Sequence, residues 1–178
     1  IRESNGTIFI NTDFDYLREM SRGITSQISY GTVDADTIGI LLENEPFLKV
    51  AIASDADVGT IQTQLVGDYN LPNVLAAVAV GKYFHVPATK IKKAIEDYTP
   101  SNSRSQLVIK NSNRIILDAY NANPSSMKVA VENFAKMHAG KKLLMLGGMA
   151  ELGEESVLEH NALIDLIQQY KWYKVVLV

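Results

Sequence analysis

The sequence contains no cysteine among its 178 residues. This absence excludes a disulfide-linked scaffold, catalysis by a thiol and a zinc site built from cysteines. No apolar run approaches the roughly 20 residues that a membrane-spanning helix needs. The chain also lacks the pattern G-x-x-x-x-G-K-[ST], so it cannot hold a nucleoside triphosphate in a P-loop. Its histidines, His85, His138 and His160, do not have the spacing that is typical of metal ligands.

Charge is nearly balanced overall but unevenly distributed along the chain. The 17 Lys and Arg against 20 Asp and Glu give a net charge of −3, which argues against broad nonspecific binding to nucleic acid. Residues 1–100 hold 8 basic and 13 acidic side chains, whereas residues 101–178 hold 9 basic and 7 acidic ones. The balance changes near residues 98–103, a polar stretch that includes a proline. Such a stretch is typical of a linker, so we predict two domains, residues 1–102 and residues 103–178.

Hydrophobic periodicity predicts an α/β fold in both domains. In the first domain we expect strands at residues 7–10, 26–30, 37–43, 47–53 and 60–66, and helices at residues 14–20, 72–83 and 88–98. In the second domain we expect strands at residues 114–117, 142–146 and 174–178, which alternate with helices at residues 125–137 and 156–170. This β-α-β-α-β order is typical of a parallel sheet with right-handed crossovers. The last strand is entirely apolar, so we expect it to be buried.

The strongest candidate site is the polar segment 118–123, between a predicted strand and a predicted helix. It carries Asp118, Tyr120, Asn121 and Asn123, and it follows the carboxyl end of a strand, where open parallel sheets bind ligands. The Asp118 carboxylate is suited to accept hydrogen bonds from a pair of ribose hydroxyls. The alternative is that Asn123 or a neighbouring serine only caps the next helix. The segment has more polar side chains than a single cap needs, which favours a site.

A second candidate is the glycine-containing segment 147–153, which leads into a predicted helix that carries His160. Glycines permit close approach of the backbone to a ligand, and a helix amino terminus favours an anion. The spacing differs from the G-x-G-x-x-G pattern of dinucleotide-binding loops. The alternative is a flexible loop with solvated carboxylates such as that of Glu151, followed by a structural histidine.

Two amides and one arginine complete the set of candidates. Asn70 and Asn73 precede an alanine-rich predicted helix, and their side chains offer the donor and acceptor that an adenine edge requires. In isolation that segment is more typical of an ordinary turn and helix cap. Arg104 lies in the predicted linker, where a fixed cation can reach phosphate oxygens.

Taken together and in this order, the segments resemble the Mur ligases of peptidoglycan synthesis. The resemblance rests on four runs of sequence: Ile10-Asn11-Thr12-Asp13, Gly67-Asp68-Tyr69-Asn70-Leu71-Pro72-Asn73, Tyr120-Asn121-Ala122-Asn123-Pro124, and Met149-Ala150-Glu151-Leu152-Gly153 with His160. Within the family, the last two are most similar to those of the ligases that add D-alanyl-D-alanine. Three positions differ from the family's usual pattern: Tyr69 replaces a His, Ser103 a Gly and Gly148 an Asp.

The resemblance implies a fold and a function. Residues 1–102 would be the C-terminal part of a central ATP-binding domain, and residues 103–178 the N-terminal half of a Rossmann-like, parallel-sheet C-terminal domain. The implied cofactors are ATP and Mg²⁺, and the implied substrates are UDP-N-acetylmuramoyl-tripeptide and D-alanyl-D-alanine, joined through an acyl phosphate. A cytoplasmic location follows, without membrane insertion or a nucleic-acid partner.

The resemblance also implies roles for the candidate residues. The positions implied to bind nucleotide are Asn70, Asn73, Arg104 and Asp118. The positions implied to lie in loops that face substrate are Tyr120, Asn121, Asn123, Glu151 and His160. No residue of this chain is assigned a catalytic role or a metal.

The start at Ile1 and the missing P-loop lead us to expect an internal fragment that is catalytically inactive alone. Two alternatives remain at this stage. One is another Mur-type ligase, of the murein-peptide-recycling or folylpolyglutamate type. The other is a non-catalytic nucleotide-binding or interaction module.

Overall fold

The computed structural model describes residues 6–101 and 103–178 of the chain. The chain divides into two units, Ile1–Pro100 (unit 1) and Ser101–Val178 (unit 2). The passage from one unit to the other therefore falls within the polar stretch 98–103. Among the residues that the structure describes, no helix combines the length and the apolar character needed to cross a membrane.

Unit 1 is built on a mixed five-stranded sheet with the order β1-β2-β3-β4-β5. Its strands are β1 (Ile8–Asn11), β2 (Gln27–Gly31), β3 (Thr37–Glu43), β4 (Lys49–Ile52) and β5 (Thr60–Gln62). The first three strands run parallel to one another, whereas β3, β4 and β5 pair antiparallel. Each predicted strand of this unit is present, although β5 ends well before residue 66.

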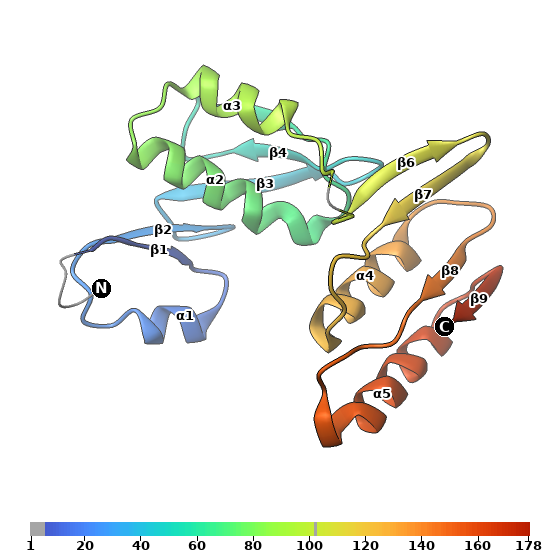
Figure 1. Cartoon of the computed structure of the whole chain (residues 1–178). Coiled ribbons are helices and arrows are strands. Elements are labelled where there is room, and N and C mark those ends of the chain that lie inside the picture. Colours follow the sequence, from blue (N-terminus) through green and yellow to red (C-terminus); the bar gives the residue numbers. More distant parts are fainter. Residues whose placement is uncertain (1–5, 102) are drawn as a thin grey trace. The chain divides into compact units, whose positions relative to one another are not determined.

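The helices of unit 1 are α1 (Asp15–Met20), α2 (Leu71–Tyr83) and α3 (Ala88–Asp97), with a 3-10 turn, η1 (Asp68–Asn70), just before α2. A proline in its first turn favours the start of α2, because that position needs no backbone N–H donor. Figure 1 shows α2 and α3 on the same side of the sheet. The core between these helices and the sheet consists of Leu48, Val50, Ile52, Val58, Ile61, Leu71, Val74, Leu75, Val78 and Ile91.

Side-chain hydrogen bonds fix the loops that follow β1 and β2. The Asp13 carboxylate accepts hydrogen bonds from the backbone N–H and from the hydroxyl of Thr32, both at 2.8 Å. Asn11 is buried, and its Oδ1 accepts from the backbone N–H of Asp13 at 3.0 Å. A Cβ at Gly31 would lie only 2.5 Å from Oγ1 of Thr12. A residue without a side chain therefore allows the two loops to approach each other.

Unit 2 contains two separate two-stranded sheets. Strands β6 (Gln106–Lys110) and β7 (Asn113–Leu117) form an antiparallel hairpin, and β8 (Leu143–Leu146) pairs with β9 (Lys174–Leu177) in parallel. The helices are α4 (Pro124–Lys136) and α5 (Ser156–Gln168), and a 3-10 turn, η2 (Gly153–Glu155), precedes α5. The predicted parallel pairing is therefore present between β8 and β9.

The prediction that β7 belongs to the same parallel sheet is wrong. In the described part of the chain β7 pairs with β6, a strand that the periodicity analysis missed. The two strands are joined by a tight turn in which Asn111 has a φ of +56°, a conformation that asparagine tolerates. The predicted order of elements had no strand before residue 114, and so it offered β7 no antiparallel neighbour.

The core of unit 2 lies on one face of the β8–β9 pair. Its buried residues are Val131, Leu144 and Ile167, packed against Phe134, Leu146, Leu163, Leu166, Trp172 and Val175. On the opposite face the side chain of Met145 is 66% exposed, and at the end of β9 that of Leu177 is 56% exposed. The expectation of a buried last strand is therefore wrong for this chain, because the described helices cover only one face of the pair.

We expect Gly39→Ala to destabilise unit 1 by about 1–3 kcal/mol. A Cβ at this position would clash with a methyl group of Leu75, which is fully buried in the core. Urea unfolding followed by far-ultraviolet circular dichroism measures the change. Gly140→Ala is the control, because a Cβ there meets no atom within 4 Å. Equal stability of the two variants would contradict the packing described for α2.

Candidate functional site

The β6–β7 hairpin brings together two segments that the sequence analysis singled out separately. Beyond the strands, the backbone N–H of Ser105 donates to Oδ1 of Asp118 at 3.2 Å. The backbone N–H of Ala119 donates to the carbonyl oxygen of Ser103 at 2.7 Å. These two hydrogen bonds extend the pairing of the hairpin, so Arg104 lies beside the segment that follows Asp118.

Arg104 stacks on the ring of Tyr120. Its guanidinium carbon lies 3.6 Å from the ring centroid, within the range of a cation–π interaction. Both side chains are exposed to solvent, Tyr120 to 63%. Among residues 6–101 and 103–178, no carboxylate forms an ion pair with Arg104. The arginine therefore presents its positive charge to solvent.

The backbone on either side of Arg104 is left-handed. Ser103 has a φ of +57° and Ser105 a φ of +50°, a region that costs non-glycine residues about 1–2 kcal/mol each. The hydrogen bonds from Ala119 and to Asp118 hold both residues in this conformation. Glycine, the residue expected here from the resemblance, adopts such a conformation without steric cost.

The setting of Asp118 differs from the expectation. We predicted that it follows a parallel strand, but it follows β7, which is part of an antiparallel hairpin. Its Oδ1 accepts from Ser105, and in the described part of the chain its Oδ2 has no hydrogen-bond partner. Asp118 therefore keeps an exposed oxygen that can accept a hydrogen bond from a ligand.

Asn123 forms the amino-terminal cap of α4. Its Oδ1 accepts from the backbone N–H of Ser126 at 2.9 Å, and the Ser126 hydroxyl accepts from the backbone N–H of Asn123 at 3.2 Å. This reciprocal pair is a capping box. The capping alternative is therefore confirmed for Asn123, whereas Tyr120 and Asn121 remain exposed.

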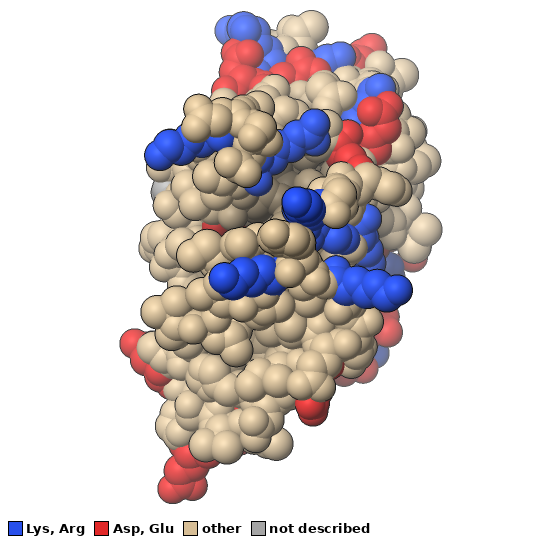
Figure 2. Space-filling model, turned by 90° about the vertical axis from the view of Figure 1, so that its right-hand side faces the viewer, with Lys and Arg blue, Asp and Glu red and all other residues tan. Residues whose placement is uncertain are grey.

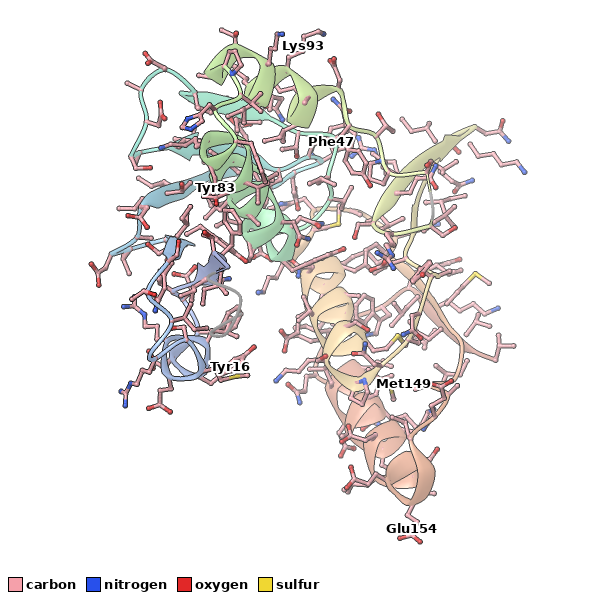
Figure 3. The ribbon with its side chains drawn as sticks, turned by 60° about the vertical axis from the view of Figure 1, so that its left-hand side comes forward. Tyr16, Phe47, Tyr83, Lys93, Met149 and Glu154 are labelled. Atoms are coloured by element: carbon pink, nitrogen blue, oxygen red, sulfur yellow. The ribbon has the colours of Figure 1, made fainter. Side chains whose placement is uncertain are left out.

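His160 binds the glycine-containing loop 147–153 to helix α5. Its Nε2 accepts from the backbone N–H of Met149 at 3.0 Å, and its Nδ1 lies 2.7 Å from the carbonyl oxygen of Ser156. With Nε2 accepting from Met149, Nδ1 is placed to donate to the Ser156 carbonyl oxygen. Figure 3 shows Met149 in this loop and Glu154 in the following turn η2, with its side chain pointing outward. Both ring nitrogens of His160 are thus engaged within the chain.

Glu151 projects from the same loop. It is exposed and has a φ of +63°, and Gly153 two residues later has a φ of +56°. The loop therefore presents a carboxylate to solvent from a sharply turned backbone.

Asn70 and Asn73 lie at the start of α2 in unit 1. Asn70 is buried, and its amide group donates to the carbonyl oxygen of Val66 at 2.9 Å. Its Oδ1 accepts from the amide of Asn73 at 3.0 Å. Asn70 is therefore fixed by its neighbours, and the exposed Asn73 is the member of the pair that can reach a ligand.

A hollow of about 520 Å³ lies close to this pair. Its lining comes from the residue after β2, from β3, and from η1 and the start of α2. The residues that line it are Thr32, Gly39, Ile40, Leu41, Asp68, Tyr69, Leu71 and Pro72. The lining is largely apolar and includes one aromatic ring and one carboxylate, which suits a flat, weakly polar group.

Residues 101–178 carry 9 basic and 7 acidic side chains, a small excess of positive charge. Figure 2 shows Lys and Arg side chains across the middle of the face in view. No group of three or more His, Asp or Glu side chains in the described ranges gathers so as to hold a metal ion.

We expect Ser103→Gly to stabilise unit 2 by up to about 1 kcal/mol, because glycine adopts a φ of +57° without steric cost. The fluorescence of Trp172, the single tryptophan, reports unfolding of this unit because the residue packs in its core. Ser112→Gly is the control, since Ser112 has no positive φ. A loss of stability in Ser103→Gly would contradict the strain described here.

We expect His160→Ala to destabilise unit 2 by about 1–3 kcal/mol, because the N–H of the largely buried residue Met149 loses its acceptor. Urea unfolding followed by Trp172 fluorescence measures the loss. Asn161→Ala, at an exposed position next to it on α5, is the control. If the two variants are equally stable, His160 does not anchor the loop.

Comparison with known proteins places this geometry in a family. Residues 103–178 match the family described as "Mur ligase, glutamate ligase domain". The chain is 30% identical over 167 residues to a UDP-N-acetylmuramoyl-tripeptide–D-alanyl-D-alanine ligase of Treponema pallidum; the match covers 81% of this chain and 36% of that protein. The chain spans about a fifth to a third of the length of the curated relatives it matches first.

Solved structures show the same fold. The chain superposes on a crystal structure of MurF from Acinetobacter baumannii with a TM-score of 0.81 and 24% identity, covering 97% of this chain and 38% of that one. The MurF ligase from Thermotoga maritima in complex with ADP gives a TM-score of 0.71 and 18% identity, with 96% and 44% covered. With the family match in unit 2 and relatives that extend across both units, the chain belongs to the Mur ligase family.

Proposed function

We propose that this chain is part of an ATP-dependent ligase that adds D-alanyl-D-alanine to UDP-N-acetylmuramoyl-tripeptide in peptidoglycan synthesis. The relative in Treponema pallidum carries that name. The observation that carries the proposal is the meeting of Arg104 and Asp118 at the base of the β6–β7 hairpin. An exposed cation and an exposed carboxylate there are suited to the phosphate and the ribose of one nucleotide.

In this proposal unit 1 belongs to the C-terminal part of a central ATP-binding domain and unit 2 to the N-terminal half of the C-terminal domain. Asp118 accepts hydrogen bonds from ribose hydroxyls through its unengaged oxygen, and Arg104 donates to phosphate oxygens. Asn73 contacts the adenine side, while Asn70 holds Asn73 in place through their hydrogen bond. The name of the Thermotoga maritima structure, a MurF ligase with ADP, supports a nucleotide as the ligand.

In this proposal the reaction has two steps. The tripeptide carboxylate attacks the terminal phosphorus of ATP, giving an acyl phosphate and ADP. The amine of D-alanyl-D-alanine then attacks the acyl carbon, an amide bond forms and phosphate leaves. Mg²⁺ would neutralise phosphate charge when bound, and among the described residues no three or more His, Asp or Glu side chains gather as a metal site.

The loops of unit 2 contribute in two ways. The exposed side chains of Asn121 and Glu151 are the ones available to the incoming substrate. Asn123 and His160 act indirectly, because their hydrogen bonds fix the segments from which those side chains project.

The test uses the full-length protein that contains this sequence. We expect ADP formation that requires both the UDP-linked tripeptide and D-alanyl-D-alanine. Arg104→Gln and Asp118→Asn should each raise the KM for ATP about tenfold or more, the usual effect of losing a charge-assisted hydrogen bond. Asp165→Asn, at an exposed position on α5, should leave that KM unchanged. The 178-residue chain alone should form no ADP.

Competing acceptors make the assay specific. Amino acids such as D-glutamate, L-lysine or diaminopimelate, offered in place of D-alanyl-D-alanine, should give no product. Equal turnover with one of them would assign the chain to another Mur-type ligase, and an unchanged KM in Arg104→Gln and Asp118→Asn would remove the nucleotide assignment.

A further inference from the structure

The way in which the Tyr120 ring contacts the Arg104 guanidinium matters for binding. The Arg104 guanidinium carbon lies 3.6 Å from the Tyr120 ring centroid, so the ring occupies one face of the guanidinium group. The five N–H donors of a guanidinium lie in its plane and point outward from its edge. Stacking on a ring therefore leaves these donors available to a ligand, whereas an ion pair with a carboxylate would use two of them.

Arg104 has few other restraints. It is exposed, and in the described part of the chain no carboxylate pairs with it. A long, exposed arginine side chain samples many rotamers. Asp118 lies across the hairpin from Ser105, and its Oδ1 accepts from the Ser105 backbone N–H. The ring of Tyr120 is thus the contact that restricts the guanidinium.

The backbone places the two side chains together. The hydrogen bond from Ala119 to Ser103 joins the residues that immediately precede Tyr120 and Arg104. The left-handed conformations of Ser103 and Ser105 turn the chain on both sides of Arg104. The stack therefore depends on the same hydrogen bonds that close the base of the hairpin, which distinguishes it from a chance contact between two mobile surface side chains.

We propose that Tyr120 is a positioning residue, whose ring holds the Arg104 guanidinium with its N–H edge free to bind a phosphate group of the nucleotide. The inference rests on the proposed function, in which Arg104 contacts that phosphate. It assigns Tyr120 to the nucleotide rather than to the incoming amino substrate. The part of Tyr120 that matters is its aromatic ring, and its hydroxyl is dispensable.

The test measures KM for ATP and kcat in the full-length protein for Tyr120→Leu, Tyr120→Phe, Arg104→Gln and the double variant Tyr120→Leu with Arg104→Gln. We expect Tyr120→Leu to raise the KM for ATP about two- to five-fold, the range expected for an exposed cation–π contact. The kcat and the KM for D-alanyl-D-alanine should not change. Tyr120→Phe should retain the wild-type KM. In the Arg104→Gln background, Tyr120→Leu should have no further effect.

A control and a spectroscopic measurement separate the outcomes. Tyr173→Leu removes another exposed tyrosine of unit 2, which lies under Lys141, and should leave the KM for ATP unchanged. In nuclear magnetic resonance spectra, the side-chain protons of Arg104 should show a ring-current shift that Tyr120→Leu abolishes and Tyr120→Phe keeps.

Three results would overturn the inference. If Arg104→Gln raises the KM for ATP and Tyr120→Leu does not, Tyr120 has no positioning role while the proposed function stands. If Tyr120→Phe is as impaired as Tyr120→Leu, the hydroxyl acts rather than the ring. If Arg104→Gln itself leaves the KM for ATP unchanged, the nucleotide assignment of Arg104 fails, and the role of Tyr120 fails with it.

Discussion

The register of the β6–β7 ladder is the constraint on which the candidate site depends. Gln106 pairs with Leu117 at the open end of the hairpin, so the next residues outward, Ser105 and Asp118, meet through a hydrogen bond. A slip of one residue would turn each side chain to the opposite face of the hairpin and would separate Arg104 from Tyr120. The site is therefore a product of strand pairing, although its polar side chains lie outside the strands.

Much of the fold could be predicted from the sequence, because it follows from local patterns. Val50 and Ile52 alternate with less buried residues along β4, and the prolines at positions 72 and 87 lie where α2 and α3 begin. Strand partners could not be predicted in the same way. The apolar run of β6 and the asparagines around its turn were visible signals, but the order of strands and helices favoured a parallel partner for β7. Strand pairing depends on which segments meet in the folded chain, and the spacing of strands and helices along the sequence does not specify those partners.

The sequence identified the polar residues of the site more readily than their partners. Arg104 and Asp118 were singled out independently, and the hairpin brings them together. The stack of Arg104 on Tyr120 was not anticipated, because the two residues are separated by a whole hairpin. Likewise, the pattern around His160 indicated a loop of interest, but only the distances to Met149 and Ser156 show that both ring nitrogens act within the chain.

The segments around Asn70, Asn123 and His160 each lie where a loop enters a helix, and in each a polar side chain holds the local backbone. The first turn of a helix leaves backbone N–H groups without partners. Asn123 satisfies such groups directly, whereas Asn70 and His160 bond the backbone of the adjoining loop. A side chain that fills this role is no longer free for a ligand. A binding loop in this position therefore needs a second set of polar residues beside the first, and Asn73, Asn121 and Glu151 are among the exposed side chains that remain.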